Sequence, residues 1–222
     1  MLANVLVKNF EAGGPIMWPI LIAGIVSVAV VGERAFWWWR ESTKRDPQTL
    51  EKLFGALENG DFREASALSK DSSDPIVRMV WHGINHYHSS LQGALQVAAG
   101  VEIQKAGRFL TIMDTLVTLA PLLGLLGTVS GIFRTFLSIG SATVEGATGA
   151  ITGGIGEALI ATMCGLAIAI FALVPFNFFT RKLAQLEFEL GSAATNVEVM
   201  VNAAKMKGYD TMEFRKEPTR TP

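Results

Sequence analysis

The 222-residue sequence is strongly apolar: half of its residues are hydrophobic, 18% are charged and the mean hydropathy is +0.34. Soluble domains carry about 25% charged residues, so this composition argues against a soluble globular protein. A net charge of −1 without a basic recognition motif gives no support to nucleic-acid binding, and the single cysteine, Cys164, excludes an intrachain disulfide.

Three predominantly apolar segments are each long enough to cross a bilayer, which takes about 20 such residues. The N-terminal arm, residues 1–14, lacks a basic region before an apolar core, so we do not expect a cleaved signal. The first span is predicted at 15–39, with Trp18 and "FWWWR" at its borders, where aromatic rings suit the membrane interfaces. The second span is predicted at 109–139 and the third at 150–180, joined by the loop 140–149.

The segment between the first two spans, residues 40–108, has the signals of several helices. Asp46-Pro47 is typical of a helix N-cap followed by proline at the first helical position, and Asp74-Pro75 indicates another helix start. No proline occurs from Ser90 to Ala120. We therefore expect one helix to run from this region directly into the second span.

The segment after the third span, residues 181–222, begins with a helix that carries an apolar seam. The spacing alternates between three and four residues, as in a coiled coil. Such a seam is buried either against neighbouring chains or, as an amphipathic helix, against the cytoplasmic region of its own chain, and both alternatives stay open. The seam consists of Leu183, Leu186, Leu190, Ala193, Val197, Met200 and Ala204.

The lysines and arginines predict the orientation in the membrane. Residues 40–108 hold nine of the nineteen and residues 181–222 hold seven, whereas the N-terminal arm has only Lys8 and the loop 140–149 has none. The positive-inside rule then places the middle segment and the C-terminus in the cytoplasm, and the N-terminus and the loop outside. The expected fold is an all-α membrane protein with three transmembrane helices, two of them extended into the cytoplasm.

Two stripes of small and polar residues follow the predicted second and third spans. At about 100° per residue, each set falls along one face of its helix. Small residues let helices approach closely where lipid offers no hydrophobic drive, so helix packing is the simplest interpretation. The second-span stripe is Pro121, Gly124, Thr128, Gly131 and Thr135, and the third-span stripe is Gly154, Ala158, Thr162, Gly165 and Ala169.

Arg134 in the second span and Glu157 in the third add another signal, because ionisable groups in a membrane are costly and face protein or water. Along two antiparallel helices, residue numbers rise in opposite directions, so pairs of residues at one depth share nearly the same sum of residue numbers. Thr128 and Thr162 meet this condition, and so do Arg134 and Glu157. We expect the two hydroxyls at one level and an Arg134–Glu157 ion pair about one to two turns further out.

Four segments of the chain resemble one protein family. The second span carries "APLLGLLGTVSGIF" and the third carries "GIGEALIATMCGLAIAIFALVPFN", which together are similar to the signature of the ExbB/TolQ/MotA family of proton-channel motor subunits. The first-span "VVGERAF" and the cytoplasmic "SDPIVRMVW" resemble the ExbB/TolQ branch. Flagellar MotA-type stators differ, since they have four spans and a larger cytoplasmic domain.

The resemblance implies a homopentameric ring in the bacterial inner membrane. Its central pore would hold the transmembrane helices of a dimer of a smaller, single-span ExbD- or TolR-like partner, whose aspartate takes and releases protons. The pore-lining threonines of the family fall on Thr128 and Thr162, and its third-span glutamate falls on Glu157. Ion flow would rotate the partner and deliver work through a TonB- or TolA-like protein. The stripe expected to contact the partner helix is Pro121, Gly124, Gly131, Thr135, Ala158, Gly165 and Ala169.

Two functional interpretations stay open. One is a stator subunit that converts proton motive force into work for TonB-dependent transport or Tol-type envelope processes, or a gliding or flagellar-type stator using H⁺ or Na⁺. The other is a passive oligomeric membrane scaffold without ion coupling. We expect no enzyme activity, no cofactor and no metal: His82 and His86 have a metal-sharing spacing, but Gly83 stands where a zinc motif needs glutamate.

Overall fold

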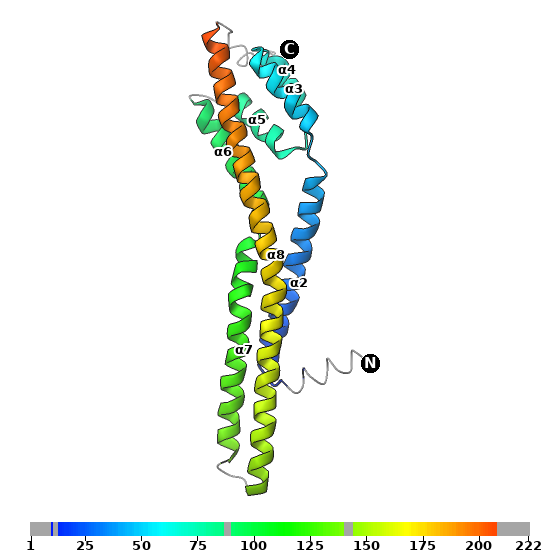
Figure 1. The fold of residues 1–222 in the computed structure, drawn as a ribbon, viewed down its shortest axis with the longest axis vertical. Coiled ribbons are helices and arrows are strands. Elements are labelled where there is room, and N and C mark those ends of the chain that lie inside the picture. The colour runs from blue at the N-terminus through cyan, green and yellow to red at the C-terminus, as the bar shows by residue number, and fades with distance from the viewer. Residues whose placement is uncertain (1–9, 11–12, 87–89, 140–143, 208–222) are drawn as a thin grey trace, which may run out of the picture. The chain divides into compact units, whose positions relative to one another are not determined.

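The computed structural model describes residues 10, 13–86, 90–139 and 144–207, and all the secondary structure in them is helical. Three helices, α2, α7 and α8, are long and apolar enough to cross a membrane, so the chain is a multi-pass membrane protein as predicted. Most of the N-terminal arm, residues 140–143 of the predicted loop and the end of the C-terminal segment lie outside the described residues. The helices are α2 (Met17–Ser42), α3 (Pro47–Glu58), α4 (Phe62–Ser69), α5 (Pro75–His86), α6 (Leu91–Ala106), α7 (Leu110–Ile139) and α8 (Val144–Met206), shown in Figure 1.

The chain divides into two compact units. The first contains residues 1–35 and 109–179, and the second contains residues 36–108 and 180–222. Helices α2 and α8 contribute residues to both units, because the boundaries after residues 35 and 179 fall within them, whereas the boundary after residue 108 lies between α6 and α7.

The first unit consists of the apolar parts of α2, α7 and α8. Met17, Ile20 and Ala161 form its buried cluster, with Leu123 and Ile168 among the side chains packed around it. Outside this cluster many large apolar side chains are exposed, and those more than half exposed include Trp18, Leu122, Val129, Ile170 and Val174. An apolar exterior of this kind suits lipid or further transmembrane helices.

The second unit is a helical domain built from α3 to α6 and the C-terminal part of α8. Its core brings together Leu53 and Leu57 of α3, Val77 of α5 and Leu95 of α6. The predicted seam of α8 lies in the same core, with Leu183 and Met200 partly buried and the other five members buried. Of the two alternatives for the seam, the structure therefore supports burial against the chain's own helices.

The helix starts of the second unit follow the capping signals in the sequence. Helix α3 begins at Pro47, and the Asp46 side chain accepts a hydrogen bond from the Thr49 N–H at 3.0 Å. Helix α5 begins at Pro75, and Asp74 Oδ1 accepts from the Ile76 N–H at 2.8 Å. Each carboxylate satisfies an N–H that the helix itself leaves without a partner, so both predicted starts are confirmed.

Two predictions about helix boundaries are wrong. The single helix expected from Ser90 into the second span is divided into α6 and α7, because Phe109 has a left-handed backbone (φ 66°) that an α-helix does not accommodate. The predicted loop 140–149 is helical from Val144 onward. Its glycines lower helix propensity, but unlike proline they keep the backbone N–H donors.

Candidate functional site

An ion pair joins α7 and α8, as the sequence analysis predicted for Arg134 and Glu157. Arg134 of α7 and Glu157 of α8 form a salt bridge, in which Arg134 Nη2 donates to Glu157 Oε1. Their side chains are 41% and 23% exposed. Both residues lie in helices that are apolar enough to span a membrane. The pairing matters there because an isolated charge in such a setting costs several kcal/mol.

The two threonines use their hydroxyls in different ways. Thr128 Oγ1 donates to the Leu125 carbonyl of its own helix at 2.6 Å, which is the usual local bond of a helical threonine. Thr162 Oγ1 donates to the Gly124 carbonyl at 2.9 Å and so links α8 to α7. Both residues are half-buried. Each hydroxyl oxygen still has lone pairs to accept a proton donor, and the pore-lining role stays a prediction.

The glycines of the two stripes lie against the facing helix. A Cβ placed on Gly124 would lie 3.0 Å from the Thr162 Cα, and one placed on Gly165 would lie 2.5 Å from the Ala120 carbonyl oxygen. A Cβ on Gly131 would lie 3.2 Å from both the Ala158 Cβ and the Gly154 carbonyl oxygen. Backbone therefore meets backbone along the stripes, and packing within the chain explains why glycine occupies these positions.

The remaining stripe residues have mixed surroundings. Ala158 and Ala169 are buried, at 3% and 8% exposure. Pro121 lies within α7 and is half-buried. Thr135 is also half-buried, and its Oγ1 donates to the Gly131 carbonyl at 2.9 Å. The predicted contact of this stripe with a partner helix involves a second chain, and it stays a prediction.

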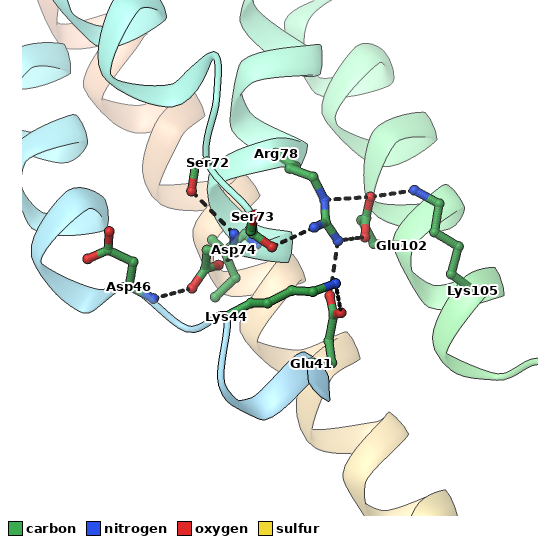
Figure 2. A network of polar contacts seen from close by, with 10 residues as sticks. Glu41, Lys44, Asp46, Ser72, Ser73, Asp74, Arg78, Glu102 and Lys105 are labelled. Carbon is green, nitrogen blue, oxygen red and sulfur yellow. Dashed lines mark hydrogen bonds and ion pairs between the residues drawn. The ribbon is translucent and has the colours of Figure 1, made fainter. Parts of the chain in front are cut away.

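A second polar cluster, in the helical domain of the second unit, centres on Arg78 of α5. Its Nη2 donates to Glu102 Oε2 of α6 at 2.6 Å and to Glu41 Oε1 of α2 at 3.0 Å, as Figure 2 shows. Lys105 and Lys44 donate to the same two carboxylates, at 2.9 Å and 2.7 Å. The Glu41 and Glu102 side chains are only 7% and 6% exposed. Three helices are thus joined through one guanidinium group.

The cluster continues to the turn before α5 and to the start of α3. Arg78 Nη1 donates to the Ser73 carbonyl at 2.5 Å, and the Asp46 N–H donates to Asp74 Oδ2 at 2.9 Å (Figure 2). Asp74 is buried, at 3% exposure. The loop residues that connect the helices are therefore held by the same group of charges.

The charges in this cluster shift the pKa values of its members. Burial alone would raise the pKa of Glu102, but hydrogen bonds from Arg78 and Lys105 outweigh it, and the pKa lies below its usual value. Burial would lower the pKa of Arg78, yet Glu102 and Glu41 raise it overall. At the edge of this cluster, the pKa of the half-buried Asp46 is lowered by its hydrogen bonds from Thr49. Glu102 and Arg78 therefore stabilise each other's charged forms.

Sequence reasoning did not predict the Arg78 cluster, although a signal for part of it was present. Glu102 follows Leu95, Ala98 and Ala99 on the buried face of α6. A carboxylate at helical spacing on an apolar face requires a cationic partner. Arg78 lies in the segment "SDPIVRMVW". Nothing in the periodicity pairs the two residues, because they are 24 positions apart.

The first unit also contains a fully buried arginine. Arg34 of α2 is 1% exposed, forms a salt bridge with Glu33 at 2.5 Å, and has its guanidinium 5.6 Å from the centre of the Phe109 ring. Contact with the face of an aromatic ring stabilises a cation. Arg34 lies in the segment "VVGERAF", for which the sequence indicated a family resemblance but no partner.

Three apolar spans, with an arginine–glutamate pair and hydroxyl groups on two of them, define a multi-pass membrane protein that carries a charged site between its helices. The sequence profile of the MotA/TolQ/ExbB proton channel family matches residues 71–191, which is more than half of the chain. The chain belongs to this family.

Individual relatives agree with this assignment. The chain is 35% identical to the ExbB-like biopolymer transport protein 3 of Synechocystis over 184 residues, which are 81% of this chain and 86% of the relative. It is 34% identical to the ExbB-like protein 1 of the same organism, over 78% of this chain and 69% of that relative. The biopolymer transport protein ExbB of Xanthomonas campestris is 43% identical over 40% of this chain and 34% of its own length. These relatives support a proton-channel role of the ExbB type.

Proposed function

We propose that this chain is the stator subunit of an ion-driven complex in the bacterial inner membrane. Its α7 and α8 would carry Glu157, Thr128 and Thr162 toward the aspartate of an ExbD- or TolR-like single-span partner. The observation that supports the proposal most directly is the Arg134–Glu157 pair, because a charged carboxylate and its counter-ion are retained inside otherwise apolar helices.

The site combines a carboxylate, Glu157, with two hydroxyl groups beside the proposed path of the ion. Arg134 is the counter-ion of Glu157. A hydroxyl group cannot hold a proton charge at ordinary pH, but it donates, accepts and orients. The partner's aspartate would carry the proton. In its protonated form it can donate to the Thr128 or Thr162 oxygen, whereas a charged carboxylate is solvated only when a hydroxyl turns away from its backbone carbonyl.

The assembly that we propose is a pentamer around a dimer of the partner, with the N-terminus periplasmic and the C-terminus cytoplasmic. The large apolar side chains exposed on α7 and α8, such as Leu122, Val129 and Val174, support further helix contacts in the membrane. The distribution of lysine and arginine supports the orientation. Work would pass to a TonB- or TolA-like protein, for TonB-dependent transport or for Tol-type envelope maintenance.

The proposal is tested by isolating the native complex and by replacing the carboxylate. We expect a single-span protein with an aspartate in its span to co-purify with this chain from its own membranes. Glu157→Gln should abolish partner-dependent proton uptake in reconstituted vesicles while the complex still assembles. Normal uptake by this variant would contradict the proposed ion pathway and favour the alternative of a passive scaffold.

A further inference from the structure

The chain segment just before α2 lies against the charged site. Residues 13–16, called here the N-terminal turn, are fixed by hydrogen bonds from the Gly13 N–H to the Phe10 carbonyl at 3.3 Å and from the Met17 N–H to the Gly14 carbonyl at 3.1 Å. The Phe10 ring meets the Trp18 ring edge-on, with 5.1 Å between centroids. The turn is thus held at both of its ends.

Gly14 is the residue of this turn that faces the ion pair. Its φ of 70° is a left-handed conformation that favours glycine. A Cβ placed on Gly14 would overlap Glu157 Oε1, and it would lie 2.6 Å from Glu157 Cδ and 2.9 Å from Arg134 Nη2. Glycine is therefore required here twice, once for the backbone conformation and once for the space that the carboxylate occupies.

Neighbouring contacts show that the turn is packed on both helices of the site. A Cβ on Gly127 of α7 would lie 2.9 Å from Ile16, and a Cβ on Gly13 would lie 3.3 Å from Ile160 of α8. The turn consequently contacts both α7 and α8, and Gly14 is the part of it that lies at the pair. The position of the Glu157 carboxylate is defined by Arg134 on one side and by the turn backbone on another.

We infer that the N-terminal turn covers Glu157 and that Gly14 is a positioning residue for its carboxylate. The inference rests on the proposed function in so far as Glu157 belongs to the ion pathway. While the turn is in place, it closes one approach to the carboxylate, and it keeps the side chain in the rotamer that contacts Arg134. Displacing the turn would expose Glu157 to reagents, protons or a partner residue from that side.

The test measures access to the carboxylate directly. The complete chain, in membranes that contain its native partners, is treated with a membrane-permeant carbodiimide, and the adduct on Glu157 is quantified by mass spectrometry. Gly14→Ala should raise the labelling rate about three- to tenfold, which is the population change that a strained side-chain torsion produces. The matched control is Gly60→Ala, because Gly60 has almost the same φ, 73°, but lies in the turn between α3 and α4. Equal labelling of the two variants would overturn the inference.

A shorter carboxylate provides an independent check. In Glu157→Asp the acid is one methylene shorter and is withdrawn from the turn. Adding Gly14→Ala to this variant should therefore change its labelling less than Gly14→Ala changes the wild type. Equal effects in the two backgrounds would mean that Gly14 acts only on the backbone, and would contradict a positioning role.

A second variant applies if Gly14→Ala does not accumulate in the membrane. Phe10→Ala removes the ring contact with Trp18 without adding atoms near Glu157. It should also raise the labelling rate, and an unchanged rate would overturn the inference. Labelling does not depend on transport. If Glu157→Gln retains proton uptake while Gly14→Ala changes labelling, the proposed ion pathway fails and the positioning role stands.

Discussion

Replacing Arg78 by methionine should destabilise the helical domain of the second unit strongly. The change leaves Glu41 and Glu102, at 7% and 6% exposure, without their shared guanidinium group. Removing one partner of a buried ion pair costs about 3–5 kcal/mol. Lys44 and Lys105 still contact the two carboxylates, so we expect the lower end, about 3 kcal/mol, or a fall in Tm of about 6–12 °C for a chain of this size.

The assay is thermal unfolding of the full chain in detergent, followed by tryptophan fluorescence, because Trp37 and Trp38 pack against the core of this unit. Lys105→Met is the matched control. Its side chain is 54% exposed, and losing such a pair costs about 1 kcal/mol or less. Adding Glu102→Gln to Arg78→Met should restore part of the lost stability, because it removes one unpaired charge. A fall in Tm no larger than that of Lys105→Met would refute the central role of Arg78.

Three further predictions follow from other contacts. Thr128→Val and Thr162→Val should each reduce partner-dependent proton uptake about tenfold or more, since a hydrogen bond to a charged group contributes roughly 1.5–3 kcal/mol. The control Thr115→Val loses only a local bond to the Thr111 carbonyl and should not reduce uptake. Full activity of both Thr128→Val and Thr162→Val would mean that these threonines serve helix packing only. Gly165→Ala should lower the Tm by overlap with the α7 backbone, whereas Gly156→Ala, with nothing within 4 Å of an added Cβ, should be neutral; similar Tm values would contradict the close approach. The pKa of Glu102 is lowered in the folded state, so its stabilising contribution is complete above the unfolded pKa of about 4.3 and is lost as pH falls through the folded pKa. The wild type and Glu102→Gln should therefore converge in stability at low pH. A stability difference that does not change with pH would contradict this role of Glu102.

The parts of the structure that follow local rules could be predicted from the sequence. Apolar length predicted three spans, and the aspartate–proline pairs predicted where α3 and α5 begin. The depth rule for antiparallel helices suggested that Arg134 and Glu157 are neighbours, because an ordinary helical rise relates residue number to depth in both spans.

The parts that depend on distant contacts could not be predicted. The break before α7 was missed because it depends on the left-handed backbone of Phe109 and not on a proline. The Arg78 cluster was missed because its members come from three helices that are far apart in the sequence. For the glycine stripes, spacing indicated close packing of the second and third spans, and the structure places α7 and α8 against each other, but spacing could not give the individual backbone contacts.

The Arg134–Glu157 pair also bears on how the protein is made. Its two residues belong to consecutive apolar helices that are separated by residues 140–143. Inserting an arginine alone at the centre of a membrane helix costs about 2.5–3.5 kcal/mol at the translocon, and Arg134, which lies near the end of α7, carries part of this cost. Since the neutralising glutamate arrives on the next segment to be synthesised, we expect α7 and α8 to enter the membrane together as a helical hairpin. Cutting the gene between them should then leave the arginine-bearing half poorly inserted unless the other half is supplied at the same time.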